Sequence, residues 1–307
     1  MLHTPVLFLI FNRPDTTGKV FQELRKQRPK HLYIAADGPR ADHPDDERLC
    51  RECKGIVADI DWDCDIRTLF RTENLGCGAG PATAITWFFS QVDTGIILED
   101  DCIPNPSFFR FCETMLIRYK DNPRIMMVCG TSYQPRPLNN NTYYFSKYPH
   151  AWGWATWKRA WQHYQFNLAT ENEATRQAVV NSTFSHARER KLWIHNLQHI
   201  TKGLDAWDYQ WMYWIWKNQG LCITPWRNMV SNIGFGPQAT HTFDRSSAQA
   251  AMQQYEIDAI VHPEHLEIGR KADQYERFNI LIDPNRKYFL NRCRAALKRI
   301  RRILLKK

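Results

Sequence analysis

The sequence has no hydrophobic run long enough to cross a membrane. The longest run near the N-terminus is residues 5–11, PVLFLIF, whereas a spanning helix needs about 20 apolar residues. The N-terminus also lacks a basic stretch followed by an apolar segment and a small-residue cleavage site, so we expect no secretory signal. These absences predict a cytoplasmic protein.

The cysteines give no sign of a disulfide or zinc framework. There are nine of them, and an odd number without a secretory signal indicates reduced thiols. Cys50 and Cys53 form a CxxC pair, but no second pair and no paired histidines follow at the spacing of a zinc site. We interpret the pair as two positions on a polar helix.

The excess positive charge is confined to the C-terminus. The net charge is +9, and residues 290–307 contain eight basic and no acidic residues, which leaves +1 for the rest. A nearly neutral body argues against nucleic acid as a partner. In the tail Cys293, Leu297, Ile300 and Leu304 have helical spacing, which predicts a basic amphipathic helix that binds an anionic membrane surface peripherally. A solvated tail is the alternative.

Short apolar segments alternate with segments of helical periodicity in the first half of the chain. The expected strands are 5–11, 31–36, 65–70, 95–98 and 124–129, and the expected helices are 15–28, 45–60, 81–91 and 106–119. This alternation is typical of an α/β fold with a mostly parallel central sheet flanked by helices. Ligands bind such sheets at the C-terminal ends of the strands.

The second half is rich in tryptophan, with ten of the twelve between Trp152 and Trp226. Two sets have helical spacing and predict buried helix faces: Trp154, Trp157 and Trp161, and Trp207, Trp211 and Trp214. Trp152 falls in an expected loop, where it could contact a sugar.

The chain divides into three expected parts. We expect residues 1–130 to bind a nucleotide-sugar. Residues 131–245 would form the acceptor-binding and catalytic half of the same domain. Residues 246–307 would form a helical tail with a helix near 247–261.

Three consecutive carboxylates, Glu99, Asp100 and Asp101, follow the expected strand 95–98. They would repel one another unless a cation lies among them. Mg²⁺ and Mn²⁺ take oxygen ligands and commonly pair one or two carboxylates with substrate phosphates. The position at the end of a buried strand favours a metal site over a solvated acidic turn.

The stretch GIILEDDCIPNPSFFRF resembles the metal-binding segment of GT-A fold nucleotide-sugar glycosyltransferases, above all the N-acetylglucosaminyltransferase I type. PVLFLIFNRP, the turn at Asp37 and the helix before the carboxylates extend the resemblance, and WDYQW and the segment before His241 do so more loosely. The chain also resembles bacterial sugar-nucleotide transferases. The resemblance implies a GT-A fold and a metal-dependent glycosyltransferase of bacterial surface polysaccharide synthesis.

The resemblance also implies roles for single residues. Asp101 would contact Mn²⁺ or Mg²⁺ directly, and Glu99 and Asp100 would face the ribose or the donor sugar. The nucleotide pocket would contain Asn12, Arg13 and Asp37. Since a carboxylate can accept the imide N–H of uracil, Asp37 favours a UDP-sugar donor. Ordinary turn residues are the alternative for Arg13 and Asp37.

Two glycine-rich segments are further candidates. In residues 71–80 glycines let the backbone approach a ligand and leave amides free to donate, so we expect Asn74 and Gly76 near the nucleotide. Residues 231–241 read as a loop that closes over the donor and excludes water. His241 at its end would give the metal a nitrogen ligand, as a late histidine does in related transferases. A structural histidine is the alternative.

Asp208 is the candidate general base. An inverting transfer needs a carboxylate that removes the proton of the acceptor hydroxyl, and Asp208 lies in an aromatic stretch where burial would raise its pKa. Asp205 is its rival, and a helix N-cap is the structural alternative for Asp208.

The expected acceptor is a glycan or a lipid-linked glycan at the inner face of the cytoplasmic membrane. Two other function classes remain open. A sugar-1-phosphate nucleotidylyltransferase should carry an N-terminal glycine-rich loop with a basic ending, which PVLFLIFNRP lacks. A non-catalytic carbohydrate- or membrane-binding protein would not need the three carboxylates.

Overall fold

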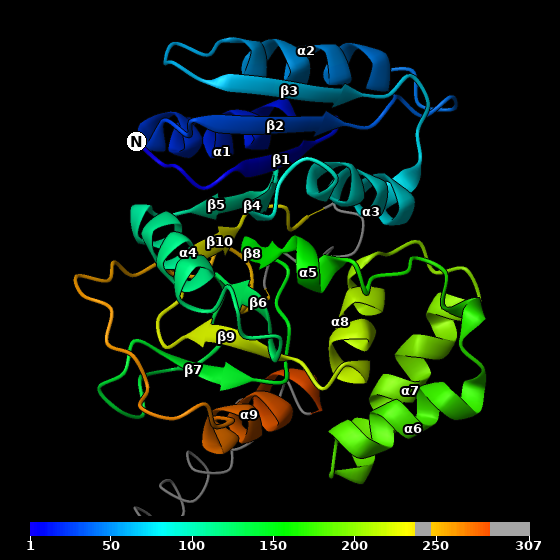
Figure 1. Cartoon of the computed structure of the whole chain (residues 1–307). Coiled ribbons are helices and arrows are strands. Elements are labelled where there is room, and N and C mark those ends of the chain that lie inside the picture. The colour runs from blue at the N-terminus through cyan, green and yellow to red at the C-terminus, as the bar shows by residue number, and fades with distance from the viewer. Residues whose placement is uncertain (237–246, 283–307) are drawn as a thin grey trace, which may run out of the picture.

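The computed structural model describes residues 1–236 and 247–282. Its fold is α/β, with a central sheet of eight strands that pair both parallel and antiparallel (Figure 1). In sheet order the strands are β3 (Asp65–Phe70), β2 (His31–Ala36), β1 (Val6–Ile10), β4 (Thr94–Glu99), β8 (Trp154–Trp157), β6 (Ile125–Cys129), β9 (Leu221–Pro225) and β7 (Tyr143–Ser146). Strands β8 and β7 run antiparallel to their neighbours, and the remaining pairings are parallel. The predicted α/β fold with a mostly parallel sheet is confirmed.

Helices cover both faces of the sheet. Along the chain they are α1 (Pro14–Gln27), α2 (Asp46–Ala58), α3 (Gly76–Phe89), α4 (Pro106–Arg118), α5 (Lys158–Trp161), α6 (Glu173–Thr183), α7 (Ala187–Thr201), α8 (Asp208–Lys217) and α9 (Arg270–Glu276), with short helical turns at η1 (Leu168–Thr170) and η2 (Arg277–Leu281). Buried side chains of α1, α2 and α4 share one core with the sheet, and those of α3, α5, α6, α7 and α8 share the other. Figure 1 shows α6, α7 and α8 grouped together.

The inner strands are mostly apolar because both of their faces are covered. In β1, Val6, Phe8 and Ile10 enter the core of α1 and α2, while Leu7 and Leu9 enter the core of α3. Phe8 is fully buried, so Phe8→Ala would cost about 3–5 kcal/mol of folding stability. The same pattern makes β1 and β4 rigid supports for the polar residues that follow them.

A second sheet of two strands lies beside the end of β4. Its strands are β5 (Cys102–Pro104) and β10 (Val230–Asn232), which pair antiparallel. The backbone N–H of Ile233 then donates to the carbonyl of Asp101 at 2.8 Å. This pairing brings the segment after β10 against the carboxylates, although about 130 residues separate the two segments in the sequence.

Two expectations about secondary structure are wrong. Trp154 and Trp157 belong to strand β8 rather than to a helix, because β8 fits between β4 and β6 with both faces buried. Residues 247–261 contain turns and extended backbone instead of a helix, and they pack through backbone bonds such as Tyr255 N–H to the Asn228 carbonyl at 2.8 Å. The helical face of Trp211 and Trp214 on α8 is confirmed, and both indoles are buried.

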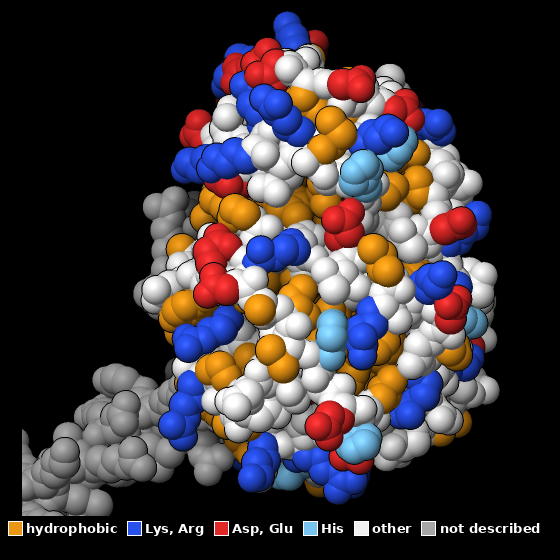
Figure 2. Space-filling model, turned by 60° about the vertical axis from the view of Figure 1, so that its left-hand side comes forward, with side chains coloured by type: hydrophobic (Ala, Val, Ile, Leu, Met, Phe, Trp, Pro, Cys, Tyr) orange, Lys and Arg blue, Asp and Glu red, His pale blue; other side chains and the backbone are white. Residues whose placement is uncertain are grey.

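The surface carries charges of both signs. On the face shown in Figure 2, Lys and Arg side chains alternate with Asp and Glu side chains, with apolar groups between them. Among the residues that the structure describes, no helix has the length and apolarity needed to cross a membrane.

Candidate active site

The three carboxylates lie at the C-terminal end of β4, as the sequence predicts. Glu99 is the last residue of the strand and is half-buried, and Asp100 and Asp101 follow it in a turn and are buried. Ligand atoms of Glu99, Asp101 and Cys102 all lie within 4.8 Å of one another, close enough to hold one metal ion. Parallel pairing of β1 with β4 places the end of β1 beside this cluster.

Arg13 is the cation that the fold brings to these carboxylates. Its guanidinium pairs with Asp100, and its Nη1 donates to Asp101 Oδ2 at 2.9 Å. Burial disfavours the charged guanidinium, but the two carboxylates outweigh burial and raise the pKa of Arg13, so it stays charged. The backbone N–H of Phe11 also donates to Asp100 at 3.3 Å. Arg13 therefore bridges β1 to the acidic turn.

The cluster still has more negative charge than Arg13 neutralises. Burial first, and then the charges of Asp101 and Asp208, raise the pKa of Glu99 to about 8. Burial also raises the pKa of Asp100, although Arg13 opposes it. A carboxyl group held this far above its ordinary pKa marks a place where a cation or a proton is favoured.

The charge of Asp208 acts on the same cluster, since it is one cause of the raised pKa of Glu99. It is the first residue of α8, is half-buried, and accepts the N–H of Tyr209 at 3.0 Å. Asp205 has a different place. Its carboxylate accepts the backbone N–H of Cys77 at 3.0 Å and of Gly78 at 2.8 Å.

Asp37 and Asp205 together occupy the N-terminus of α3. Asp37 accepts the backbone N–H of Leu75 at 2.9 Å and of Gly76 at 3.1 Å, so the two acids cover the first amides of the helix between them. Gly76 has φ 80°, and a Cβ on it would lie 2.5 Å from Asp205 Oδ2, so only glycine fits there. The amides expected to face a nucleotide are therefore already bonded within the chain.

Burial raises the pKa of Asp37, and its amide donors oppose that shift. The interactions of Asp37 give it a structural role between β2 and α3, and its contact with a base stays a prediction. Asn74 supports the same turn, because its Nδ2 donates to the Gly38 carbonyl at 2.9 Å.

Asn12 lies beside a pair of residues that the sequence did not single out. Its Nδ2 donates to Asp46 Oδ1 at 2.7 Å, and Arg40 pairs with the same carboxylate through Nε at 2.7 Å and Nη2 at 3.0 Å. These hydrogen bonds, the one from Arg40 foremost, lower the pKa of Asp46 to about 2. The signal for Asp46 was weak, because it lies in a run of charged residues that reads as a solvated helix start.

Gly234 closes over Asp101. A Cβ on Gly234 would lie 2.1 Å from Asp101 Oδ2, so the backbone passes directly against this carboxylate. Asn232 orients the turn by accepting the N–H of Gly234 at 2.8 Å. The next residue, Phe235, packs edge-on against Trp152 with ring centroids 5.7 Å apart, so an aromatic pair borders the acidic cluster. His241 lies outside the described residues.

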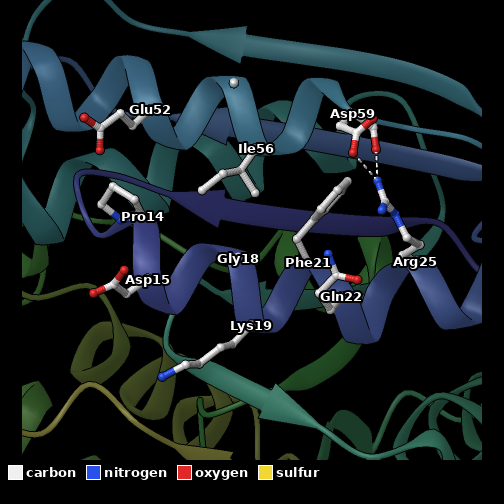
Figure 3. Close-up of a pocket in the computed structure, with 11 residues that line it drawn as sticks. Pro14, Asp15, Gly18, Lys19, Phe21, Gln22, Arg25, Glu52, Ile56 and Asp59 are labelled. Atoms are coloured by element: carbon white, nitrogen blue, oxygen red, sulfur yellow. Dashed lines mark hydrogen bonds and ion pairs between the residues drawn. The ribbon is translucent and has the colours of Figure 1, made fainter.

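A groove between α1 and α2 is a separate feature. It has a volume of about 830 Å³ and is lined by residues including Gly18, Ile56 and Asp59. Figure 3 shows Arg25 and Asp59 joined across one end of it. None of the predicted site residues lines this groove, so we do not assign it as the active site despite its volume.

Comparisons with known proteins assign the chain to no family. No protein-family model and no curated protein matches the chain. The solved structure of HddC from Yersinia pseudotuberculosis has a TM-score of 0.33 and 10% identity over 51% of this chain and 78% of its own. The same protein complexed with GMP-PN has a TM-score of 0.32 and 11% identity over 52% and 78%. A UDP-glucose pyrophosphorylase complexed with UDP-glucose has a TM-score of 0.28 and 9% identity over 47% and 62%. Likenesses this low carry no argument about function.

Proposed function

We propose that the protein is a metal-dependent glycosyltransferase that moves a sugar from a nucleotide-diphosphate sugar, a UDP-sugar by preference, to a glycan or lipid-linked acceptor with inversion. The observation that carries the proposal is the cluster at the end of β4, where ligand atoms of Glu99 and Asp101 converge. The charge of Asp208, at the start of α8, acts on the same cluster and raises the pKa of Glu99. This arrangement offers a cation site and a separate carboxylate for proton transfer at one edge of the sheet.

The residues present fit a hard divalent cation. Glu99 and Asp101 supply carboxylate oxygens, and Gly234 has no side chain to block Asp101. Mg²⁺ and Mn²⁺ prefer such oxygen ligands and share them with phosphates. When bound, the ion would neutralise charge on the diphosphate leaving group. Asp101 and Glu99 would hold it, and Arg13 would keep Asp100 and Asp101 in place through its ion pairs.

Asp208 would act as the general base. The acceptor oxygen forms a bond to the anomeric carbon while the bond from that carbon to the diphosphate oxygen breaks. The hydroxyl proton passes to Asp208, which typically accelerates such a step by about 10²–10⁴-fold. Asp205 would be a positioning residue, because its hydrogen bonds to the start of α3 hold the segment that leads into Asp208.

The aromatic pair of Trp152 and Phe235 would contact the acceptor sugar. Both side chains are half-buried and lie next to the residue that covers Asp101. The faces of aromatic rings are apolar and carry a partial negative charge, which suits the C–H face of a sugar ring. We place the acceptor sugar against this pair.

The main rival remains a sugar-1-phosphate nucleotidylyltransferase. The turn Phe11-Asn12-Arg13-Pro14 after β1 contains no glycine, and the amides of α3 are bonded to Asp37 and Asp205. Neither segment therefore offers the glycine-rich loop or the free helix N-terminus that binds the phosphates of a nucleoside triphosphate.

One experiment separates the candidates by their products. The protein is incubated with Mn²⁺ and a panel of UDP-sugars, with and without lipid-linked acceptors, and products are separated by chromatography. Release of UDP with glycosylation of the acceptor supports the proposal. Formation of UTP and sugar-1-phosphate when pyrophosphate is added supports the rival. Binding of carbohydrate without binding of any UDP-sugar supports a non-catalytic protein.

A further inference from the structure

A pair of histidines on α7 lies on the exposed side of the helix. Trp193, Leu197 and Ile200 form the buried side of α7, and His195 and His199 lie away from it and are exposed. Residues four apart on a helix project from the same face. The two imidazoles are therefore neighbours in solvent, and Figure 1 shows α7 in the group of helices that includes α6 and α8.

The geometry of the pair matches that of two ligands on one metal ion. The Nε2 atoms of His195 and His199 are 3.0 Å apart. Transition-metal to imidazole bonds are about 2.0–2.1 Å, so two nitrogens on one ion are about 2.9 Å apart at a right angle and about 3.4 Å apart at the tetrahedral angle. The observed separation falls within this interval.

The orientation of the rings points to the same conclusion. The ring centroids are 4.4 Å apart, farther than the Nε2 atoms, and the ring planes differ by 80°. The two rings therefore approach each other at their Nε2 ends. In the described part of the chain each of these rings has the other as its side-chain hydrogen-bond partner.

We propose that His195 and His199 form a surface site for a borderline transition-metal ion of the Zn²⁺, Ni²⁺ or Cu²⁺ class, held through both Nε2 atoms. Imidazole nitrogen suits these ions, whereas the carboxylates at the end of β4 suit Mg²⁺ and Mn²⁺. Within residues 1–236 and 247–282, three potential ligands converge at Glu99, Asp101 and Cys102 and not at α7. The remaining coordination positions at α7 face solvent, so water or a group from another molecule completes them.

The test is calorimetric titration of the full chain, without an affinity tag and with its thiols kept reduced, with Ni²⁺ alone. We compare wild type, His195→Gln, His199→Gln and the double variant. His163→Gln is the matched control, because His163 is exposed but belongs to the turn after α5 and not to α7. Circular dichroism checks that each variant is folded.

Wild type and His163→Gln should bind one Ni²⁺ with the same affinity at this site. Each single variant should weaken binding by at least about tenfold, equivalent to about 1.4 kcal/mol, and the double variant should abolish it. Asp101→Ala should leave this binding unchanged. The proposal is overturned if wild type binds no Ni²⁺, if the double variant keeps wild-type affinity, or if Asp101→Ala removes the binding.

Discussion

Asp205 accepts the backbone N–H of Gly78 at 2.8 Å, and this bond joins the start of α3 to the segment that enters α8. The same carboxylate accepts the N–H of Cys77 at 3.0 Å. A carboxylate at a helix N-terminus is stabilised by both the free amides and the helix dipole. Asp208 follows three residues later, and its charge helps to raise the pKa of Glu99. The two candidate bases therefore differ in their environment: Asp205 accepts the amides of α3, and the charge of Asp208 acts on Glu99.

The first prediction uses this separation. Asp208→Asn should lower kcat by at least about 100-fold with the donor KM little changed, because it removes the proton acceptor and keeps the shape of the side chain. Steady-state kinetics with a soluble acceptor analogue measures both constants. An unaffected kcat would contradict the assignment of Asp208 as the base.

Asp205→Ala should behave differently from Asp208→Asn. It leaves the amides of Cys77 and Gly78 without their acceptor, which should lower the free energy of unfolding by about 1–3 kcal/mol. Chemical denaturation measures this loss. If Asp205→Ala keeps full stability and loses only kcat, then Asp205 is the base and its positioning role is wrong.

The second prediction concerns the approach of Gly234 to Asp101. Gly234→Ala would place a Cβ 2.1 Å from Asp101 Oδ2, so the carboxylate must move. We expect Mn²⁺ affinity to fall at least about tenfold, since a displaced ligand weakens a metal site by about 10–100-fold even when the displacement arises in a supporting residue.

Gly55→Ala is the matched control for Gly234→Ala. Gly55 is exposed in α2, and a Cβ there meets nothing within 4 Å. It should leave Mn²⁺ affinity unchanged and raise stability by about 0.5–1 kcal/mol through helix propensity. Equal Mn²⁺ affinity in the two variants, measured by electron paramagnetic resonance of free Mn²⁺, would contradict the placement of the metal beside Gly234.

The third prediction concerns a buried ion pair between His150 and Glu276. His150 Nε2 lies 3.1 Å from Glu276 Oε1 of α9. Burial opposes the charged imidazole, but Glu276 outweighs burial and raises the pKa of His150 to about 9. Because this pKa lies above the ordinary value, the stabilisation is fully present below about pH 6.5 and is lost as the pH rises through 9.

The shift from the ordinary pKa corresponds to about 3 kcal/mol. The free energy of unfolding of wild type minus that of His150→Gln should therefore decrease between pH 6.5 and pH 9.5. Asp273, Tyr133 and Cys129 also interact electrostatically with this pair, so the difference between the two proteins is the quantity to compare. A difference that stays constant over this range would contradict the charged pair.

The sequence predicted the first half of the fold well because its signals are local. Strands β2 and β3 have the predicted bounds, and β1 and β4 differ by a residue or so at their ends. Apolar runs that end in polar turns are sufficient to identify parallel strands buried on both faces. The place of Glu99, Asp100 and Asp101 at the end of β4 followed from the same pattern.

The remainder depends on contacts between distant segments. Trp154 and Trp157 have helical spacing but lie in β8, because the gap between β4 and β6 decides their structure. A sequence shows neither that Asp205 caps α3 nor that Arg13 pairs with Asp101. The start of α3 was also predicted wrongly: the helix was expected from residue 81, but it begins at Gly76, so the amides that Asp205 accepts were not expected to belong to a helix.

The fourth prediction rests on the basic tail, which lies outside the described residues. Deletion of residues 290–307 should release the protein from anionic vesicles and leave catalysis on a soluble acceptor intact. Each basic residue near an anionic leaflet contributes about 1 kcal/mol, and salt should weaken the attachment by screening. Vesicle sedimentation at low and high salt measures it. A full-length protein that stays in the supernatant at low salt would contradict the anchor.

The proposed function requires that the carboxylates at the end of β4 hold the metal that binds the donor. The most direct measurement is titration of a UDP-sugar into the protein with and without Mn²⁺, for wild type, Asp101→Ala and Asp59→Ala. Asp59 is the control because it also pairs with an arginine, Arg25, but lies away from the site. We predict Mn²⁺-dependent binding in wild type and Asp59→Ala and its loss in Asp101→Ala. Equal Mn²⁺-dependent binding in wild type and Asp101→Ala would show that these carboxylates do not hold the metal.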